Sequence, residues 1–171
     1  MTMEKILPKK SFAAWVKKLA GSEIFAPVEK EGVWTIERVE GLKEIGPEYP
    51  NTVQAPKKII FPQCETLFEF DTDAEGHPGV RETLPASAER VVFGVRPCDA
   101  RAVTLTDIVF GGKHRDPYYW ARRESTALVG MTCVTPPSAN CFCPTTGGSP
   151  HSTEGLDVLM TDLGNRYHVD A

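Results

Sequence analysis

Two short apolar runs on either side of a helical segment constrain the fold of this chain more than any other feature. Residues 90–95 (RVVFGV) and 127–133 (ALVGMTC) are rich in β-branched and large apolar residues, as is typical of strands buried on both faces of a sheet. Between them, residues 99–110 carry apolar side chains at helical spacing, with Asp99 where an N-cap is expected. A strand, a helix and a second strand in this order predict a parallel α/β unit.

The first fifty residues predict a smaller unit. Residues 11–19 have apolar side chains at helical spacing, and residues 23–28 and 32–39 have the composition of two strands joined by a charged turn. Residues 41–56 are rich in glycine and proline and predict a long connection. The fold class expected is therefore α/β, with a mixed or parallel sheet and flanking helices. We expect two units: a helix and hairpin at 1–50, and an α/β domain at 51–171.

Charge and hydropathy exclude two classes of function. The net charge is −4, and the Lys and Arg residues are scattered rather than gathered into a basic stripe, so nucleic-acid binding is not expected. The N-terminus has no apolar signal segment, and no stretch approaches the roughly 18 apolar residues of a membrane span. We therefore expect a cytoplasmic protein.

The five cysteines need a role other than disulfide bonding, because disulfides are rare in the cytoplasm and an odd number cannot pair fully. Cys98 follows the first apolar strand and Cys133 ends the second. Both are therefore expected at the carboxyl ends of neighbouring strands, where open α/β sheets place ligands. Cys141 and Cys143 follow in a loop rich in proline and glycine. Cys98 is expected at the turn between strand and helix, where the helix N-terminus would lower the pKa of its thiol, as suits a metal ligand.

The spacing of these cysteines leaves three interpretations open. Four thiols on one rim could hold a [4Fe-4S] cluster, with backbone N–H groups of the loop directed at its sulfurs. Zinc is the rival, although structural zinc sites generally separate paired cysteines by two to four residues, and Cys141 and Cys143 are separated by one. Plain burial fits the lone Cys64 better than it fits the cysteines of the loop.

Other residue types give weaker indications. Arg96, Arg122 and Arg123 could place positive charge near an anionic cluster, or could belong to a solvated helix face. The four histidines are dispersed in polar surroundings and predict no metal site. No glycine-rich phosphate motif follows a strand, so a flavin or nicotinamide is expected on another subunit.

Several separate motifs, in order and spacing, resemble the N-terminal part of sulfhydrogenase β subunits and anaerobic sulfite reductase A subunits. The resemblance covers roughly residues 56–169 and implies an iron-sulfur electron carrier of anaerobic metabolism. It implies one [4Fe-4S] cluster bound by Cys98, Cys133, Cys141 and Cys143. The motifs that carry it are residues 94–99 (GVRPCD), 116–119 (DPYY), 122–123 (RR), 130–133 (GMTC), 141–143 (CFC), 147–150 (GGSP) and 155–162 (GLDVLMTD).

Members of that family continue into a ferredoxin-like segment with two further cluster motifs, whereas this sequence ends at Ala171. We therefore expect a non-catalytic electron-transfer subunit or domain of a multi-subunit cytoplasmic oxidoreductase. Its expected partners are redox subunits: ferredoxin-type iron-sulfur, flavin, or hydrogenase and reductase subunits. The alternative function is a zinc-stabilised structural adapter that docks a redox enzyme.

Overall fold

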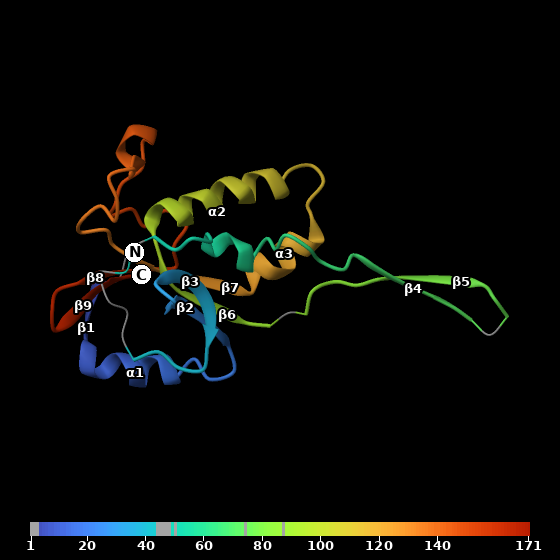
Figure 1. Ribbon diagram of the computed structural model, residues 1–171, viewed down its shortest axis with the longest axis horizontal. Coiled ribbons are helices and arrows are strands. Elements are labelled where there is room, and N and C mark those ends of the chain that lie inside the picture. The colour runs from blue at the N-terminus through green and yellow to red at the C-terminus, as the bar shows by residue number, and fades with distance from the viewer. Residues whose placement is uncertain (1–3, 44–48, 50, 74, 87) are drawn as a thin grey trace.

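A seven-stranded mixed sheet forms the centre of the computed structural model, which describes residues 4–43, 49, 51–73, 75–86 and 88–171 (Figure 1). The strand order is β1-β9-β8-β7-β6-β2-β3. The strands β2, β6, β7 and β8 pair in parallel, whereas the pairs β2–β3, β8–β9 and β1–β9 are antiparallel. The predicted α/β class with a mixed sheet is confirmed. Because β2 pairs with β6, both predicted units contribute to one sheet, and the division at residue 50 stays a prediction. The strands are β1 (Glu4–Pro8), β2 (Glu23–Lys30), β3 (Val33–Val39), β6 (Arg90–Val95), β7 (Thr126–Met131), β8 (Val158–Asp162) and β9 (Arg166–Asp170).

Helices cover both faces of this sheet. In Figure 1, α1 (Lys9–Lys17) lies below the sheet, while α2 (Pro97–Phe110) and α3 (Pro117–Glu124) lie above it. The strand-helix-strand unit predicted from the apolar runs is confirmed by β6, α2 and β7 and by the parallel pairing of the two strands. The central strands are therefore shielded from water on both sides, as their apolar composition requires.

The face below the sheet is an aromatic core built around Phe12 of α1, which is fully buried. The ring of Phe12 lies 5.9 Å from that of Phe93 and 5.4 Å from that of Tyr167, both in edge-to-face geometry. Trp15 closes the cluster against Phe93. Packing of this kind ties the N-terminal helix to β6 and to the last strand, so the two ends of the described chain lie in one core.

A bulge at Gly94 sets the direction of the chain as it leaves β6. Phe93 pairs with Val129 and Val95 pairs with Gly130, so Gly94 is an extra residue in the ladder, with φ +73°. The bulge reverses which face later residues occupy, since Phe93 packs below the sheet and Val95 above it. The next residues then form the rim on which the cysteines lie.

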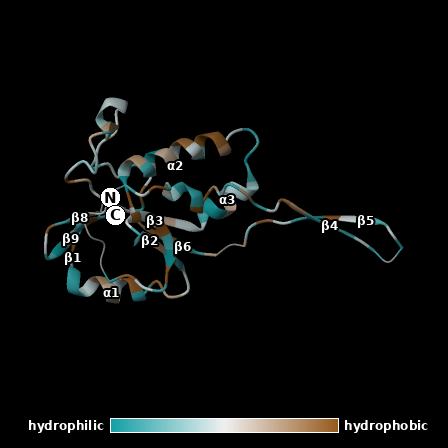
Figure 2. Ribbon diagram, viewed as in Figure 1, coloured by the Kyte–Doolittle hydropathy of each residue, from teal (hydrophilic) through white to brown (hydrophobic). Residues whose placement is uncertain are grey.

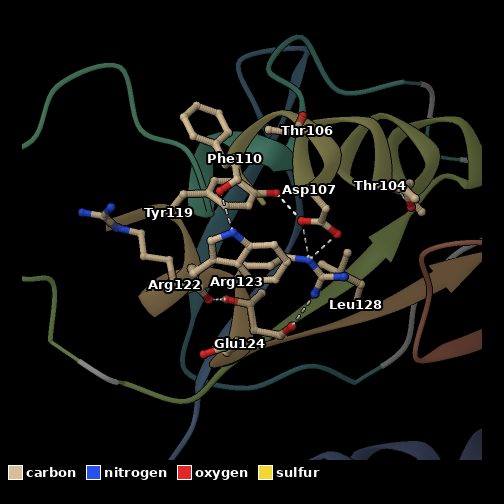
Figure 3. Close-up of polar contacts among 12 residues, drawn as sticks. Thr104, Thr106, Asp107, Phe110, Tyr119, Arg122, Arg123, Glu124 and Leu128 are labelled. Carbon is tan, nitrogen blue, oxygen red and sulfur yellow. Dashed lines mark hydrogen bonds and ion pairs between the residues drawn. The ribbon is translucent and has the colours of Figure 1, made fainter. Parts of the chain in front are cut away.

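A polar network joins α2 to α3 above the sheet (Figure 3). The Tyr119 hydroxyl donates to the Asp107 carboxylate at 2.5 Å, and Arg123 Nε lies 3.2 Å from both carboxylate oxygens. Burial and the neighbouring carboxylate raise the pKa of Tyr119 well above its usual range, so its hydroxyl stays a proton donor. Asp116 caps the start of α3 by accepting from the backbone N–H of Tyr119 at 2.8 Å. Together these bonds fix α3 against α2.

Replacing Asp107 by Ala is expected to lower the free energy of unfolding by about 1–3 kcal/mol, because Arg123 and Tyr119 then lose their shared acceptor in a half-buried site. Urea unfolding of the metal-free chain measures the change. Glu124→Ala is the matched control on α3, since its ion pair with Arg115 is solvent-exposed and should contribute less than about 0.5 kcal/mol. Equal effects of the two substitutions would contradict the structural role given to Asp107.

A two-stranded hairpin of β4 (Phe68–Thr72) and β5 (Pro78–Glu82) extends away from the body (Figure 1). All ten of its residues are exposed, and Phe70 and Val80 pair across the two strands with 84% and 72% exposure. Figure 2 colours parts of both strands as hydrophobic. The polar, glycine-bearing stretch at 71–79 has the composition of a surface loop, but both of its ends, residues 71–72 and 78–79, belong to the strands of the hairpin.

Residues 58–62 (KIIFP) form no strand, although an apolar run that ends at a proline is typical of one. The chain forms a short 3-10 helix, η1 (Pro56–Ile59), whose first turn begins at a proline. Ile60, the residue after it, is buried above the sheet beside Val92 and Leu128. The apolar run therefore supplies core contacts without adding a strand, since a short apolar run alone does not distinguish helical from extended structure.

Candidate metal centre

The candidate centre lies at the carboxyl ends of β6 and β7, as the sequence predicts for Cys98 and Cys133. These two strands are parallel neighbours, and the chain reaches Cys98 three residues after β6 and Cys133 two residues after β7. The carboxyl ends of adjacent parallel strands open on the same edge of a sheet. The fold therefore brings two segments 35 residues apart in sequence onto one rim.

The helix that follows β6 begins earlier than expected. Pro97 is its first residue and Arg96 stands at the N-cap position in extended backbone, so Asp99 lies inside the first turn and is not the cap. Proline is favoured at this position because its missing N–H would have no helical partner there. Cys98 is consequently the second residue of α2, in the first turn, where Asp99 and Ala100 both donate their backbone N–H groups to the carbonyl oxygen of Arg96.

The remaining two cysteines lie in the cysteine loop, which we define as residues 132–157 between β7 and β8. The backbone N–H of Cys133 donates to the carbonyl of Pro150 at 3.2 Å, which joins the two ends of the loop. Cys141 and Cys143 lie near its tip, where η2 (Cys143–Thr146) is closed by a bond from the backbone N–H of Gly148. Proline and glycine thus shape a folded loop here.

The cysteine loop packs on the first turns of α2 at two points. Arg101 Nη1 donates to the carbonyl oxygen of Thr146 at 2.8 Å. Farther along, Gly155 approaches the helix so closely that a Cβ atom there would lie 2.7 Å from the carbonyl oxygen of Ala100 and 2.5 Å from Thr104 Oγ1. These contacts bring the loop carrying Cys141 and Cys143 toward the helix carrying Cys98.

The four thiols are electrostatic neighbours. Partial burial of the sulfur, the charge of Asp99 and the nearby thiols Cys133 and Cys143 raise the pKa of Cys98 to about 11. Burial likewise raises the pKa of Cys133, and Cys143 and Cys141 add to that rise. A metal ion reverses this balance, because a coordinating thiol is deprotonated by the ion itself.

The expectation that the helix N-terminus lowers the pKa of Cys98 is wrong for the metal-free chain. The backbone N–H of Asp99 does lower the pKa of that thiol, but burial and the neighbouring charges outweigh it. Sequence spacing reveals the helix terminus but not the carboxylate and thiols around it. Without metal, Cys98 is therefore protonated at neutral pH.

The chemistry of the donor set fits a metal or cluster, although the thiols are not in ligating positions. Within the described part of the chain, no three His, Cys, Asp or Glu side chains are close enough together to hold a metal ion as they stand. All five cysteines are free thiols, and Cys133, Cys141 and Cys143 are half-buried while Cys98 is exposed. Sulfur donors of this kind suit zinc and iron-sulfur clusters.

Arg96 is a neighbour of this centre that spacing alone did not single out from the other arginines. Its side chain is buried between the ends of β6 and β7, and its charge lowers the pKa of Cys133 against the larger effect of burial. Arg122 and Arg123, which had been grouped with it, instead form ion pairs on α3 with Glu65 and Asp107. Of the three arginines, Arg96 therefore acts directly on a candidate thiol.

The residues not predicted as ligands have ordinary surface positions. Cys64 is exposed in the connection between η1 and β4. His77 pairs with Asp73 beside the hairpin turn, and His168 lies 3.7 Å from a carboxylate oxygen of Glu4. Neither contact is with a residue of the cysteine loop.

The sequence is similar to the protein named sulfhydrogenase 2 subunit beta of Pyrococcus furiosus, with 27% identity over 146 residues. The aligned stretch covers 85% of this chain and 41% of that relative, so the chain spans about two fifths of the relative's length. This similarity agrees with the resemblance to sulfhydrogenase β subunits predicted from the motifs. No family model and no solved structure matches the chain.

Proposed function

We propose that this chain is an iron-sulfur electron-transfer subunit or domain of an oxidoreductase complex, and that it holds one [4Fe-4S] cluster. The observation that carries the proposal is the convergence of Cys98 and Cys133 on one rim, with the loop bearing Cys141 and Cys143 packed against the same helix. The similarity to a sulfhydrogenase β subunit supports the same class of cofactor.

In this proposal the four thiolates hold the cluster and the rest of the chain controls its surroundings. The bound cluster would supply a one-electron carrier. The chain's own residues fix Cys98 on the first turn of α2, fix Cys133 at the end of β7, and fold the cysteine loop by backbone hydrogen bonds. Arg96 supplies positive charge beside the ligands. In this proposal the chain itself carries electrons between partner subunits without bond chemistry.

The partners proposed are other redox subunits, of the ferredoxin-type, flavin, hydrogenase or reductase kind, in the cytoplasm. Exposed apolar side chains on the hairpin and on the outer side of α2 support an assembled protein, because large exposed apolar areas mark interaction surfaces. On α2, Leu105, Ile108 and Val109 are 57%, 69% and 73% exposed. None of the helices in the described residues is long and apolar enough to cross a membrane.

Anaerobic reconstitution of the full chain with iron and sulfide tests the cofactor. We expect a brown protein whose broad visible absorption bleaches with dithionite, with about four iron and four sulfide per chain, as one cubane cluster requires. Metal and sulfide analysis of the gel-filtered protein, together with its visible and EPR spectra, provides the measurement. The zinc content of the same protein purified aerobically should be measured for comparison.

A colourless chain that binds one zinc ion per molecule and no iron would contradict the proposal and would favour the structural adapter instead. A chain that binds neither metal would contradict both, since the thiols would then be ordinary residues. The Cys64→Ser variant, which leaves the proposed ligands intact, should give the same iron content as the wild type.

A further inference from the structure

The side chain of Arg96 is buried with an unusual set of partners. Only 3% of the residue is exposed. Its guanidinium stacks on the Tyr49 ring at 3.9 Å, and its Nη2 donates to the backbone carbonyl of Tyr49 at 2.6 Å. Nη1 lies 3.5 Å from the carbonyl oxygen of Thr132. All of these partners are neutral, so none of them cancels the charge.

The guanidinium is also left incompletely satisfied. Its Nε atom is buried and has no hydrogen-bond partner, and none of the described carboxylates lies within ion-pair distance of it. Asp99 is close enough for Arg96 to lower its pKa, but burial raises that pKa by more. A buried charge without a counter-charge is costly, so proteins generally pair it. The buried guanidinium of Arg96 is therefore suited to bind an anion.

The position of Arg96 identifies which anion. Arg96 stands directly between the two strand ends: it is two residues before Cys98, and it contacts the carbonyl oxygen of Thr132, the residue before Cys133. Its charge already acts on the Cys133 thiol. Thiolates of a metal-bound centre would be negative, and a cluster held by four of them is an anion. The unpaired donor thus lies where negative charge would gather.

We propose that Arg96 is a positioning residue that raises the reduction potential of the bound cluster by holding positive charge and a hydrogen-bond donor beside the Cys133 thiolate. This inference rests on the proposed iron-sulfur function. Reduction adds one negative charge to the centre, so a fixed cation nearby stabilises the reduced state more than the oxidised state. The effect is strong because the guanidinium is buried in the protein interior, where the dielectric constant is lower than in water.

The test compares Arg96→Gln with the wild type, both reconstituted as full chains, by redox titration followed by EPR. We expect Arg96→Gln to retain its iron and to shift the ratio of oxidised to reduced cluster about tenfold toward oxidised at a fixed potential. This shift corresponds to a potential lower by about 59 mV for a one-electron couple. Arg96→Lys keeps the charge and should shift the ratio by less than about threefold.

Arg115→Gln is the matched control, because it removes the same charge from an arginine that pairs with Glu124 at the surface, where water screens the charge. It should change the ratio by less than about threefold. If Arg96 has only a structural role, replacing it should change the iron content or the stability of the protein. The reduction potential of the molecules that retain their cluster should then be unchanged. Full iron content with an unchanged potential in Arg96→Gln would therefore overturn the inference and leave the proposed function intact.

If Arg96→Gln loses its cluster, Arg96→Met replaces it as the neutral variant, because Met keeps an unbranched side chain without the charge. A ratio shifted about tenfold toward oxidised in Arg96→Met supports the role of charge, and an unchanged ratio overturns it. Loss of iron from both neutral variants would show a structural role and would also overturn the inference. Failure of the wild type itself to bind iron overturns the proposed function, and the inference with it. Failure of the inference is therefore measured on the Arg96 variants, and failure of the proposed function on the wild type.

Discussion

Replacing Cys133 by Ser is expected to remove most of the iron from the reconstituted chain. Cys133 is central to the candidate centre, because its pKa responds to Cys141 and Cys143 and it in turn raises the pKa of Cys98. A serine hydroxyl does not ionise at neutral pH and is a poor ligand for iron in a sulfide cluster. We expect a similar loss for Ser at Cys98, Cys141 or Cys143. Iron and sulfide per chain, with the visible spectrum, measure the effect.

Cys64→Ser provides the control, because Cys64 is exposed in the connection that leads to the hairpin and is outside the motifs of the family resemblance. It should retain full iron. Circular dichroism of each variant shows whether the sheet remains folded. Full iron retention by Cys141→Ser together with loss of iron by Cys64→Ser would reverse the ligand assignment.

The centre of the fold could be predicted because its signal is local. The strands β6 and β7 are continuous apolar runs, and α2 between them has an apolar helical pattern, so strand, helix and strand follow from composition alone. The strands β2 and β3 were also predicted, since two short runs rich in β-branched residues flank a charged turn. Strand order required the structure, because pairing of β2 with β6 joins residues more than sixty positions apart.

The strands β1 and β9 were missed for the opposite reason. The strands β1 and β9 are five residues long, carry charged side chains and pair with each other at one edge of the sheet. The sequence of β1 has no apolar alternation, and that of β9 has only two alternating apolar residues, Tyr167 and Val169, which is too short a pattern to predict a strand. Likewise α3 has charged residues through its second half. Asp116 caps this helix locally, but its position is fixed by the bonds from Tyr119 and Arg123 to Asp107, which require α2.

The candidate site divides in the same way. Candidate thiol ligands can be read directly from the sequence, and the placement of Cys98 and Cys133 after two buried strands predicted that they share one edge of the sheet. The partners of Arg96 could not be predicted, because Tyr49 lies in a connection without periodic pattern and reaches Arg96 only through the fold. The hydroxyl of Tyr49 also donates to the carbonyl oxygen of Gly94 in the bulge, and this bond links the same connection to the end of β6.

Gly155→Ala is expected to weaken both the fold and the metal centre, because the residue has φ +76° and packs against α2 without room for a side chain. An alanine there incurs about 1–2 kcal/mol of backbone strain, and its Cβ would also press on the carbonyl oxygen of Ala100. The cysteine loop would have to move away from the helix that carries Cys98. We therefore expect a lower free energy of unfolding for the metal-free chain and faster loss of iron to a chelator.

Gly164→Ala separates the two causes, because Gly164 has φ +87° but no heavy atom within 4 Å of the position a Cβ would take. It should show the backbone strain alone, about 1–2 kcal/mol, with iron release at the wild-type rate. Gly155→Ala should be less stable than this control by a further amount on the order of 1 kcal/mol, and should release iron several-fold faster. Equal iron release by the two variants would show that contact between the cysteine loop and α2 does not support the centre.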